Sequence, residues 1–323
     1  MNKLRVGVIG VGYLGKFHAE KYARMDGVEL AGVVDINQTQ AGRIAEKFST
    51  TPYAAYQDLF GKVDAVSVAV PTSEHYAVSR DFLEHDVDVL IEKPMTTTLE
   101  DADRLIDIAE TRGLIIQVGH LERFNPAVVA VREFIKKPMF IESHRLGIFT
   151  PRCTDVSVVL DLMIHDIDLI LNFVGSYVRQ VHAAGISVVS NHVDIANARL
   201  EFENGGVANV TASRISTRNE RKIRLFQKEG YISVDFANRE ITVIGKNGNT
   251  TESPIPGMGI NRLCFTQADA LDDELKSFIA CVKKRQAPEV NGPVGRNALK
   301  VALTIMDQIH KTNRSVAGQG YAS

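Results

Sequence analysis

Three closely spaced glycines, Gly10, Gly12 and Gly15, constrain the fold of this chain more than any other feature of its sequence. They follow a short apolar segment at 4–9 that is rich in β-branched residues, and a helix-like segment at 13–25 comes next. In such a strand–turn–helix the first glycine allows a tight turn, the second lets the backbone approach a pyrophosphate, and the third lets the helix pack on the strand. Amide groups at the helix start then face the phosphates. The pattern predicts a dinucleotide-binding turn.

An acidic residue at the end of the next predicted strand, 28–34, strengthens this interpretation. Asp35 lies about twenty residues beyond the glycines, where a carboxylate accepts the ribose hydroxyls of a dinucleotide and repels a 2′-phosphate. No Arg follows immediately, so the sequence favours NAD over NADP, although Arg43 in the next predicted helix keeps NADP as the alternative. The cofactor contacts expected here are Gly10, Gly12, Tyr13, Leu14, Gly15, Asp35 and Ile36.

The first third of the chain alternates apolar strands with helices. Further strands are predicted at 65–70, 87–91 and 114–118, with helices at 38–48, 73–84 and 99–112. Strands that are apolar on both faces and separated by helices indicate a parallel sheet covered on both sides. We therefore predict an α/β fold in which residues 1–120 form a Rossmann domain, a doubly wound parallel sheet.

The pattern changes after about residue 120. Helices are expected at 125–136 and 156–173, and from 178 onwards short strands are joined by turns such as Asn204-Gly205-Gly206. Closing helices are expected at 269–284 and 297–310. Residues 121–323 are therefore predicted to form a second, α+β domain on a largely antiparallel open sheet, and a length of 323 residues agrees with two domains.

Charge and composition exclude several classes of partner. The net charge is −2, which gives no basic surface for nucleic acid or an anionic membrane. The start shows no signal-peptide pattern, and no apolar stretch is long enough to span a bilayer. Three widely spaced cysteines predict neither a disulfide framework nor a zinc site. We expect a cytoplasmic protein that binds a small molecule and no metal.

Two strand ends in the first domain carry polar residues. In an open α/β sheet these carboxyl ends line the ligand crevice. Lys93 follows the strand at 87–91 directly after Glu92, although a lysine at a strand end is as readily a solvated charge. The contacts expected at these two strand ends are Val70, Pro71, Thr72, His75, Glu92, Lys93 and Pro94.

The apolar helix predicted at 156–173 carries acidic residues and one histidine. Asp161 and His165 are four residues apart and share one helix face, and Asp168 lies one further turn along. Taken alone, His165 could equally be a satisfied core histidine. A metal site is a further alternative, but nothing nearby supplies a convincing third ligand.

Together these motifs resemble the glucose–fructose oxidoreductase/inositol dehydrogenase/rhizopine-catabolism (Gfo/Idh/MocA) family over nearly the whole chain. The resemblance rests on GVIGVGYLG, AVPTSEHY, Ile91-Glu92-Lys93-Pro94 and the Asp161-x-x-x-His165 pattern. It implies an open-sheet domain used in oligomer contacts, hence a homodimer or homotetramer. It also implies that Lys93 and His165 are catalytic, with Asp161 beside them. His165 would take the hydroxyl proton while hydride moves to the nicotinamide, and Lys93 would hold the substrate oxygen.

The segment Gly119-His120-Leu121-Glu122-Arg123-Phe124-Asn125-Pro126 resembles a subgroup that oxidises the 3-hydroxyl of UDP-N-acetylglucosamine. The resemblance puts His120 and Arg123 beside nicotinamide and substrate, although the segment could be only a hinge with a helix cap. Arg152 is the first candidate for a diphosphate contact. The expected substrate residues are Lys93, His120, Arg123, Arg152, Asp161 and His165. Alternatives are an inositol or free-sugar dehydrogenase and a non-catalytic NAD-binding regulator.

Overall fold

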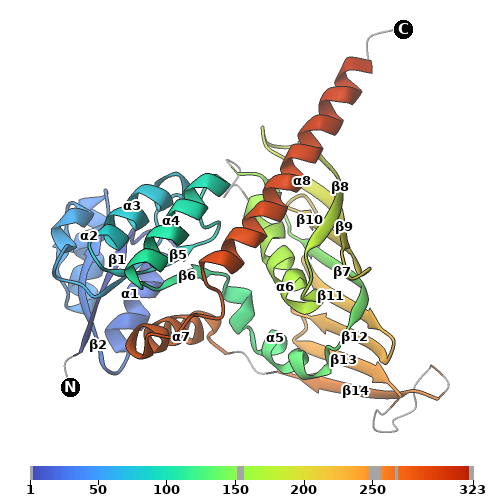
Figure 1. Cartoon of the computed structure of the whole chain (residues 1–323), viewed down its shortest axis with the longest axis horizontal. Coiled ribbons are helices and arrows are strands. Elements are labelled where there is room, and N and C mark those ends of the chain that lie inside the picture. The colour runs from blue at the N-terminus through green and yellow to red at the C-terminus, as the bar shows by residue number, and fades with distance from the viewer. Residues whose placement is uncertain (1–2, 151–155, 247–254, 256, 266–267, 320–323) are drawn as a thin grey trace. The chain divides into compact units, whose positions relative to one another are not determined.

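The computed structural model of the protein describes residues 3–150, 156–246, 255, 257–265 and 268–319, with only the backbone over 315–319. The chain divides into two compact units. Figure 1 shows the ribbon coloured by residue number from blue at the N-terminus to red at the C-terminus. The first unit comprises Met1–Leu121 and Asp269–Leu299, and the second comprises Glu122–Ala268 and Lys300–Ser323.

The first unit is built on a parallel sheet of six strands in the order β3-β2-β1-β4-β5-β6. The strands are nearly all apolar and buried, as expected for a sheet covered by helices on both faces. Their bounds are β1 (Leu4–Ile9), β2 (Val28–Val34), β3 (Pro52–Tyr53), β4 (Ala65–Val68), β5 (Asp88–Glu92) and β6 (Ile116–Gly119). This order and direction confirm the predicted Rossmann fold.

Helices connect these strands, and local capping explains where two of them begin. Asn37 accepts a hydrogen bond from the Gln40 amide at the start of α2 (Gln38–Phe48), and Thr98 accepts one from the Asp101 amide at the start of α4 (Leu99–Arg112). Gly113, with φ 64°, ends α4 in the left-handed region. The other two helices are α1 (Gly15–Arg24) and α3 (Thr72–Glu84).

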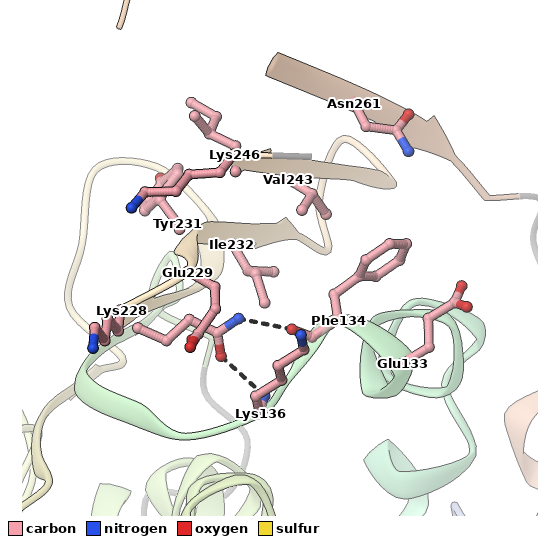
Figure 2. A pocket seen from close by; sticks show the side chains of 14 residues that line it. Glu133, Phe134, Lys136, Lys228, Glu229, Tyr231, Ile232, Val243, Lys246 and Asn261 are labelled. Atoms are coloured by element: carbon pink, nitrogen blue, oxygen red, sulfur yellow. Dashed lines mark hydrogen bonds between the residues drawn. The ribbon is translucent and has the colours of Figure 1, made fainter. Parts of the chain in front are cut away.

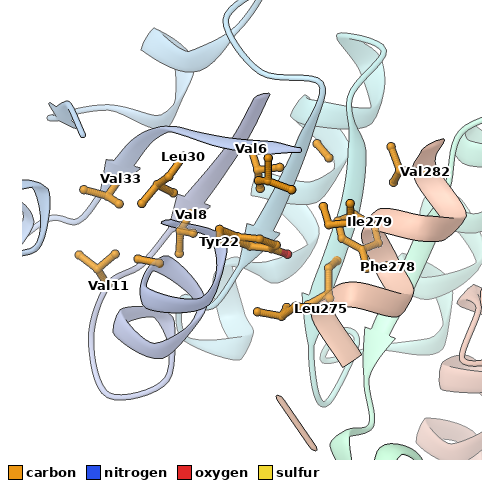
Figure 3. Packing of buried hydrophobic residues seen from close by; sticks show 14 of the residues in the cluster. Val6, Val8, Val11, Tyr22, Leu30, Val33, Leu275, Phe278, Ile279 and Val282 are labelled. Atoms are coloured by element: carbon orange, nitrogen blue, oxygen red, sulfur yellow. The ribbon is translucent and has the colours of Figure 1, made fainter. Parts of the chain in front are cut away.

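The helix α7 (Ala270–Lys284) completes the core of the first unit, whereas the sequence analysis placed it in the second domain. Figure 3 shows its buried face beside β1 and Tyr22 of α1. The apolar spacing of three and four residues along α7 requires a surface to cover, but the spacing does not identify that surface. The buried residues of this face are Leu275, Phe278, Ile279 and Val282.

The second unit is built on an eight-stranded sheet in the order β14-β13-β12-β11-β7-β10-β9-β8. Neighbouring strands are antiparallel except β7 and β10, which are parallel, so the predicted α+β domain on a largely antiparallel sheet is confirmed. The strands are β7 (Pro138–Leu146), β8 (Val178–Ile186), β9 (Ile195–Phe202), β10 (Val207–Ser213), β11 (Glu220–Gln227), β12 (Gly230–Asp235), β13 (Glu240–Gly245) and β14 (Gly259–Cys264).

Two helices of the second unit differ from expectation. The helix α5 (Pro126–Val131) continues as a 3-10 turn at Arg132–Phe134, so helical structure ends two residues before the expected 136. Beyond this turn Ile135 is extended, and Gln227 of β11 hydrogen-bonds the Phe134 carbonyl and the Lys136 amide on either side of it. The helix α6 (Ile164–Val174) follows a π-helical turn at Val159–Met163. The last helix, α8 (Gly292–Gln319), contains the division between the units. None of the described helices is both long and apolar enough to cross a membrane.

Candidate active site

The carboxyl ends of five neighbouring strands in the first unit come out at one edge of the sheet. The parallel register fixes this, because it pairs the last residues of adjacent strands: Ile9 with Val34 and Val68, Val68 with Ile91, and Glu92 with Gly119. The predicted residues that follow these strand ends are Gly10, Asp35, Val70, Lys93 and His120. The structure therefore brings them to the same edge, as the topology of a doubly wound sheet requires.

The three glycines of the first turn have different roles. Gly10 has φ 83°, and a Cβ there would lie 2.7 Å from the Ala69 carbonyl oxygen. A Cβ on Gly15 would lie 1.7 Å from the Gly10 carbonyl oxygen. By contrast, a Cβ on Gly12 would meet nothing within 4 Å. Gly10 and Gly15 are thus needed for the turn and its packing, whereas Gly12 leaves the backbone open to a ligand.

The start of α1 is suited to an anion. All residues of α1 are described, and its first turn carries no acidic residue. The residue at its N-cap, Leu14, makes no side-chain capping bond. The first amides of α1 and the positive end of the helix dipole therefore favour a phosphate. Tyr13 and Leu14 beside it are 64% and 42% exposed.

Asp35 is tied to the same turn. Its Oδ2 accepts the Val11 amide and its Oδ1 accepts the Asn37 amide, both at 2.9 Å. Each carboxylate oxygen has a further lone pair, so these bonds leave acceptor capacity for ribose hydroxyls. The next residue, Ile36, is fully exposed, which places its apolar side chain at the surface next to that carboxylate.

The Glu92-Lys93-Pro94 turn after β5 is held by two buried histidines. His18 of α1 has Nε2 3.1 Å from Glu92 Oε1. His75 of α3 has Nδ1 2.9 Å from the Pro94 carbonyl and Nε2 2.9 Å from the Val70 carbonyl. Burial lowers the pKa of His75 despite these bonds. His75 therefore connects two strand-end turns, and its contact with a cofactor stays a prediction.

In the second unit, Asp161 and His165 lie on one helical run, both half-buried. Asp161 belongs to the π-helical turn and His165 to the first turn of α6, whereas the prediction assumed a regular α-helix. A π-helical turn within an α-helix is frequently found at a functional site. Among the described residues, no three His, Cys, Asp or Glu side chains gather as metal ligands.

Two buried carboxylates that follow His165 are paired with arginines. Asp166 accepts Nε and Nη2 of Arg145 at 2.9 and 2.8 Å. Asp168 accepts Nε and Nη2 of Arg123 at 2.5 and 2.8 Å, and that guanidinium is 4% exposed. Bidentate pairs of this kind supply the geometry that makes a buried ion pair tolerable. The structure thus uses Arg123 to hold α6, and its role toward cofactor or substrate stays a prediction.

Glu122 extends this group of charges, because it forms ion pairs with Arg145, at 3.5 Å, and with Arg221 of β11. Burial lowers the pKa of Arg221 to about 10. Sequence reasoning missed Asp166 and His18, and it considered Arg145 only as a cation for a diphosphate, whereas the structure pairs it with Asp166. Acidic residues within an apolar helix were the available signal for Asp166, because buried carboxylates require cationic partners. Arg152, the expected diphosphate contact, lies outside the described residues.

A pocket of about 580 Å³ lies elsewhere in the second unit, between β12, β13 and the segment after α5 (Figure 2). Gln227, which lines this pocket, hydrogen-bonds the Phe134 carbonyl and the Lys136 amide, and the dashed lines at Phe134 and Lys136 in Figure 2 mark these two bonds. Exposed charges including Lys136, Lys228 and Lys246 surround it. None of the predicted site residues within the described part of the chain lines this pocket, so the candidate residues remain those at the sheet edge of the first unit and, separately, those on the π-helical turn and α6 of the second unit.

Comparison with known proteins identifies the family and supports the fold of both units. Residues 4–120 match the model of an oxidoreductase family with an NAD-binding Rossmann fold, and residues 144–248 match the GFO/IDH/MocA C-terminal domain. A UDP-N-acetylglucosamine 3-dehydrogenase of Acidithiobacillus ferrooxidans is 38% identical over 94% of this chain and 97% of its own. A solved structure of a protein so named from that organism has a TM-score of 0.91 at 37% identity, covering 96% of this chain and 98% of its own.

A more distant relative is the myo-inositol 2-dehydrogenase of Thermotoga maritima, 27% identical over 92% of this chain and 93% of its own. Both family models and the 38% identical relative cover the regions that carry the predicted motifs. The chain belongs to the Gfo/Idh/MocA family of oxidoreductases.

Proposed function

We propose that this protein oxidises the 3-hydroxyl of UDP-N-acetylglucosamine with NAD⁺, giving the 3-keto sugar nucleotide and NADH. The observation that carries the proposal is the 38% identity, over nearly the whole of both chains, to a dehydrogenase named for this reaction. The chain also holds Lys93 and His165 in the motifs on which the family resemblance rests.

The glycine turn and Asp35 fit a dinucleotide. Gly12 leaves open backbone where a pyrophosphate would approach, and the uncapped start of α1 offers amides to it. Asp35 would accept the ribose hydroxyls, and its charge favours NAD over NADP. When bound, the nicotinamide ring supplies the hydride acceptor.

The residues of this chain handle the proton and the oxygen. His165 would take the hydroxyl proton as the carbinol carbon loses its hydride, so that the alcohol becomes a ketone and NAD⁺ is reduced. Lys93 would bind the reacting oxygen and stabilise the negative charge that develops on it. Asp161, one turn before His165, would orient that imidazole.

A second candidate is oxidation of a free polyol, which the inositol dehydrogenase at 27% identity favours. The experiment follows NADH absorbance with UDP-N-acetylglucosamine, UDP-glucose, glucose and myo-inositol, each with NAD⁺ and with NADP⁺. We expect turnover with UDP-N-acetylglucosamine and NAD⁺. Turnover confined to the free polyols would contradict the proposal.

Two variants distinguish an enzyme from a regulator of the same fold. Lys93→Met and His165→Asn should each abolish most turnover while NAD⁺ affinity, measured by calorimetry, stays within about threefold of wild type. A protein that binds NAD⁺ but turns over none of the four substrates would be the non-catalytic alternative.

A further inference from the structure

The turn that carries Lys93 rests on a buried side-chain pair that the proposed reaction does not use. His18 of α1 is fully buried, and its Nε2 lies 3.1 Å from Glu92 Oε1. The other oxygen, Oε2, lies 3.3 Å from the Lys93 amide and accepts its hydrogen bond. Both oxygens of Glu92 are therefore engaged, one by α1 and one by the backbone of Lys93 itself.

The neighbouring strand leaves room for this carboxylate. Gly119 of β6 is opposite Glu92 in the parallel register. A Cβ at Gly119 would lie 3.0 Å from Glu92 Oε2, which is closer than most such contacts. The absence of a side chain at residue 119 thus accommodates an acid at residue 92.

The hydrogen bond fixes the role of one ring nitrogen of His18. Glu92 Oε1 is a carboxylate oxygen and accepts, so Nε2 of His18 donates the proton between them. In the described part of the chain, Nδ1 of the same ring is buried and has no hydrogen-bond partner.

The environment of Glu92 agrees with a charged carboxylate. Burial raises the pKa of Glu92, but the hydrogen bond and the charge interaction with His18, followed by the positive charge of Lys93, outweigh it, so its pKa lies below the ordinary value. Other ionisable groups that interact with it are His75 of α3, whose pKa burial lowers, and Tyr22 of α1.

We propose that His18 and Glu92 are positioning residues for Lys93: His18 fixes the carboxylate, and the carboxylate holds the backbone of the Lys93 turn. This role rests on the proposed function, in which the Lys93 side chain binds the substrate oxygen. A carboxylate held beside the turn would keep Lys93 correctly placed without itself contacting the substrate.

A substrate-free experiment tests how the turn is held. The rate at which an acylating reagent modifies Lys93 at pH 8 is measured by mass spectrometry of its peptide. Glu92→Gln keeps the shape but removes the charged acceptor that His18 and the Lys93 amide share, so the turn loosens, the Lys93 amine becomes more accessible and we expect labelling about tenfold faster. Asp88→Asn is the matched control, since Asp88 is a buried carboxylate on the same strand, paired with Arg285. It should leave Lys93 labelling unchanged, and equal rates in wild type and Glu92→Gln would overturn the proposal.

Variants of His18 test the hydrogen bond. His18→Gln keeps an N–H donor and should retain kcat within about threefold, whereas His18→Leu should lower kcat at least tenfold and accelerate Lys93 labelling. NAD⁺ affinity should stay unchanged in both. A loss of NAD⁺ affinity in His18→Leu with unchanged Lys93 labelling would show a merely structural role. Because labelling needs no substrate, its result tests the role of His18 and Glu92 independently of whether the proposed sugar nucleotide is the substrate.

Discussion

The guanidinium of Arg123 and the carboxylate of Asp168 form a buried, bidentate ion pair within the second unit. This pair joins the segment after residue 121 to α6, three residues beyond His165. The charged residues of that segment, Glu122 and Arg123, both have partners within the same unit. Its sequence pattern therefore has a structural explanation in addition to any role toward a substrate.

Breaking this pair should destabilise the second unit. Asp168→Asn leaves the buried guanidinium without its counter-charge, so we expect the free energy of unfolding to fall by about 3–5 kcal/mol in urea titrations. The control is Glu201→Gln, which breaks a pair with Arg179, whose side chain is 66% exposed, and should cost less than about 1 kcal/mol. Equal losses in the two variants would contradict the assignment.

The three glycines should separate into folding and binding roles. Gly15→Ala forces a Cβ against the Gly10 carbonyl, so its melting temperature should fall clearly. Gly12→Ala meets no protein atom and should melt near wild type, while calorimetry shows NAD⁺ affinity at least tenfold weaker. Unchanged NAD⁺ affinity in Gly12→Ala would argue against the pyrophosphate position.

Stability should depend on pH through His75. Because burial lowers its folded-state pKa, the unfolded chain binds more protons than the folded chain below about pH 6.5. The contribution is therefore complete above that pH and is lost as the pH falls through the folded-state value. His75→Gln should give a flatter dependence of unfolding free energy between pH 7 and pH 5. His182→Gln, at an exposed histidine, should keep the wild-type slope.

The packing of α7 gives a further test. Phe278 is fully buried in the core of the first unit, so Phe278→Ala should cost about 3–5 kcal/mol and weaken NAD⁺ binding as that unit loosens. Lys276→Ala, on the exposed face of the same helix, should have little effect on either measurement. Wild-type stability of Phe278→Ala would show that α7 is not part of this core.

Much of this architecture could be predicted because local rules and the tertiary structure agree. The apolar strand β1, the glycines after it and the cap at Asn37 each specify their own conformation, and the family models confirm the Rossmann assignment. The largely antiparallel sheet of the second unit could likewise be predicted from its turns.

The remaining features depend on contacts between distant residues. The segment that follows the 3-10 turn after α5 is held by Gln227, and the location of α7 is set by the core around Tyr22. The His18–Glu92 pair joins residues 74 positions apart. Single-sequence patterns show that a helix has an apolar face or that a strand ends in an acid, but they do not identify the partner.

The return of α7 to the first unit has a consequence for synthesis on the ribosome. Strand β6 ends at Gly119, yet the core around Tyr22 lacks Leu275 and Phe278 until about 150 further residues have emerged. During that interval the nascent first unit exposes apolar surface that α7 later covers. The first unit therefore cannot complete its core before the second unit has been synthesised. Until then its apolar surface stays exposed on the nascent chain or is shielded by a chaperone.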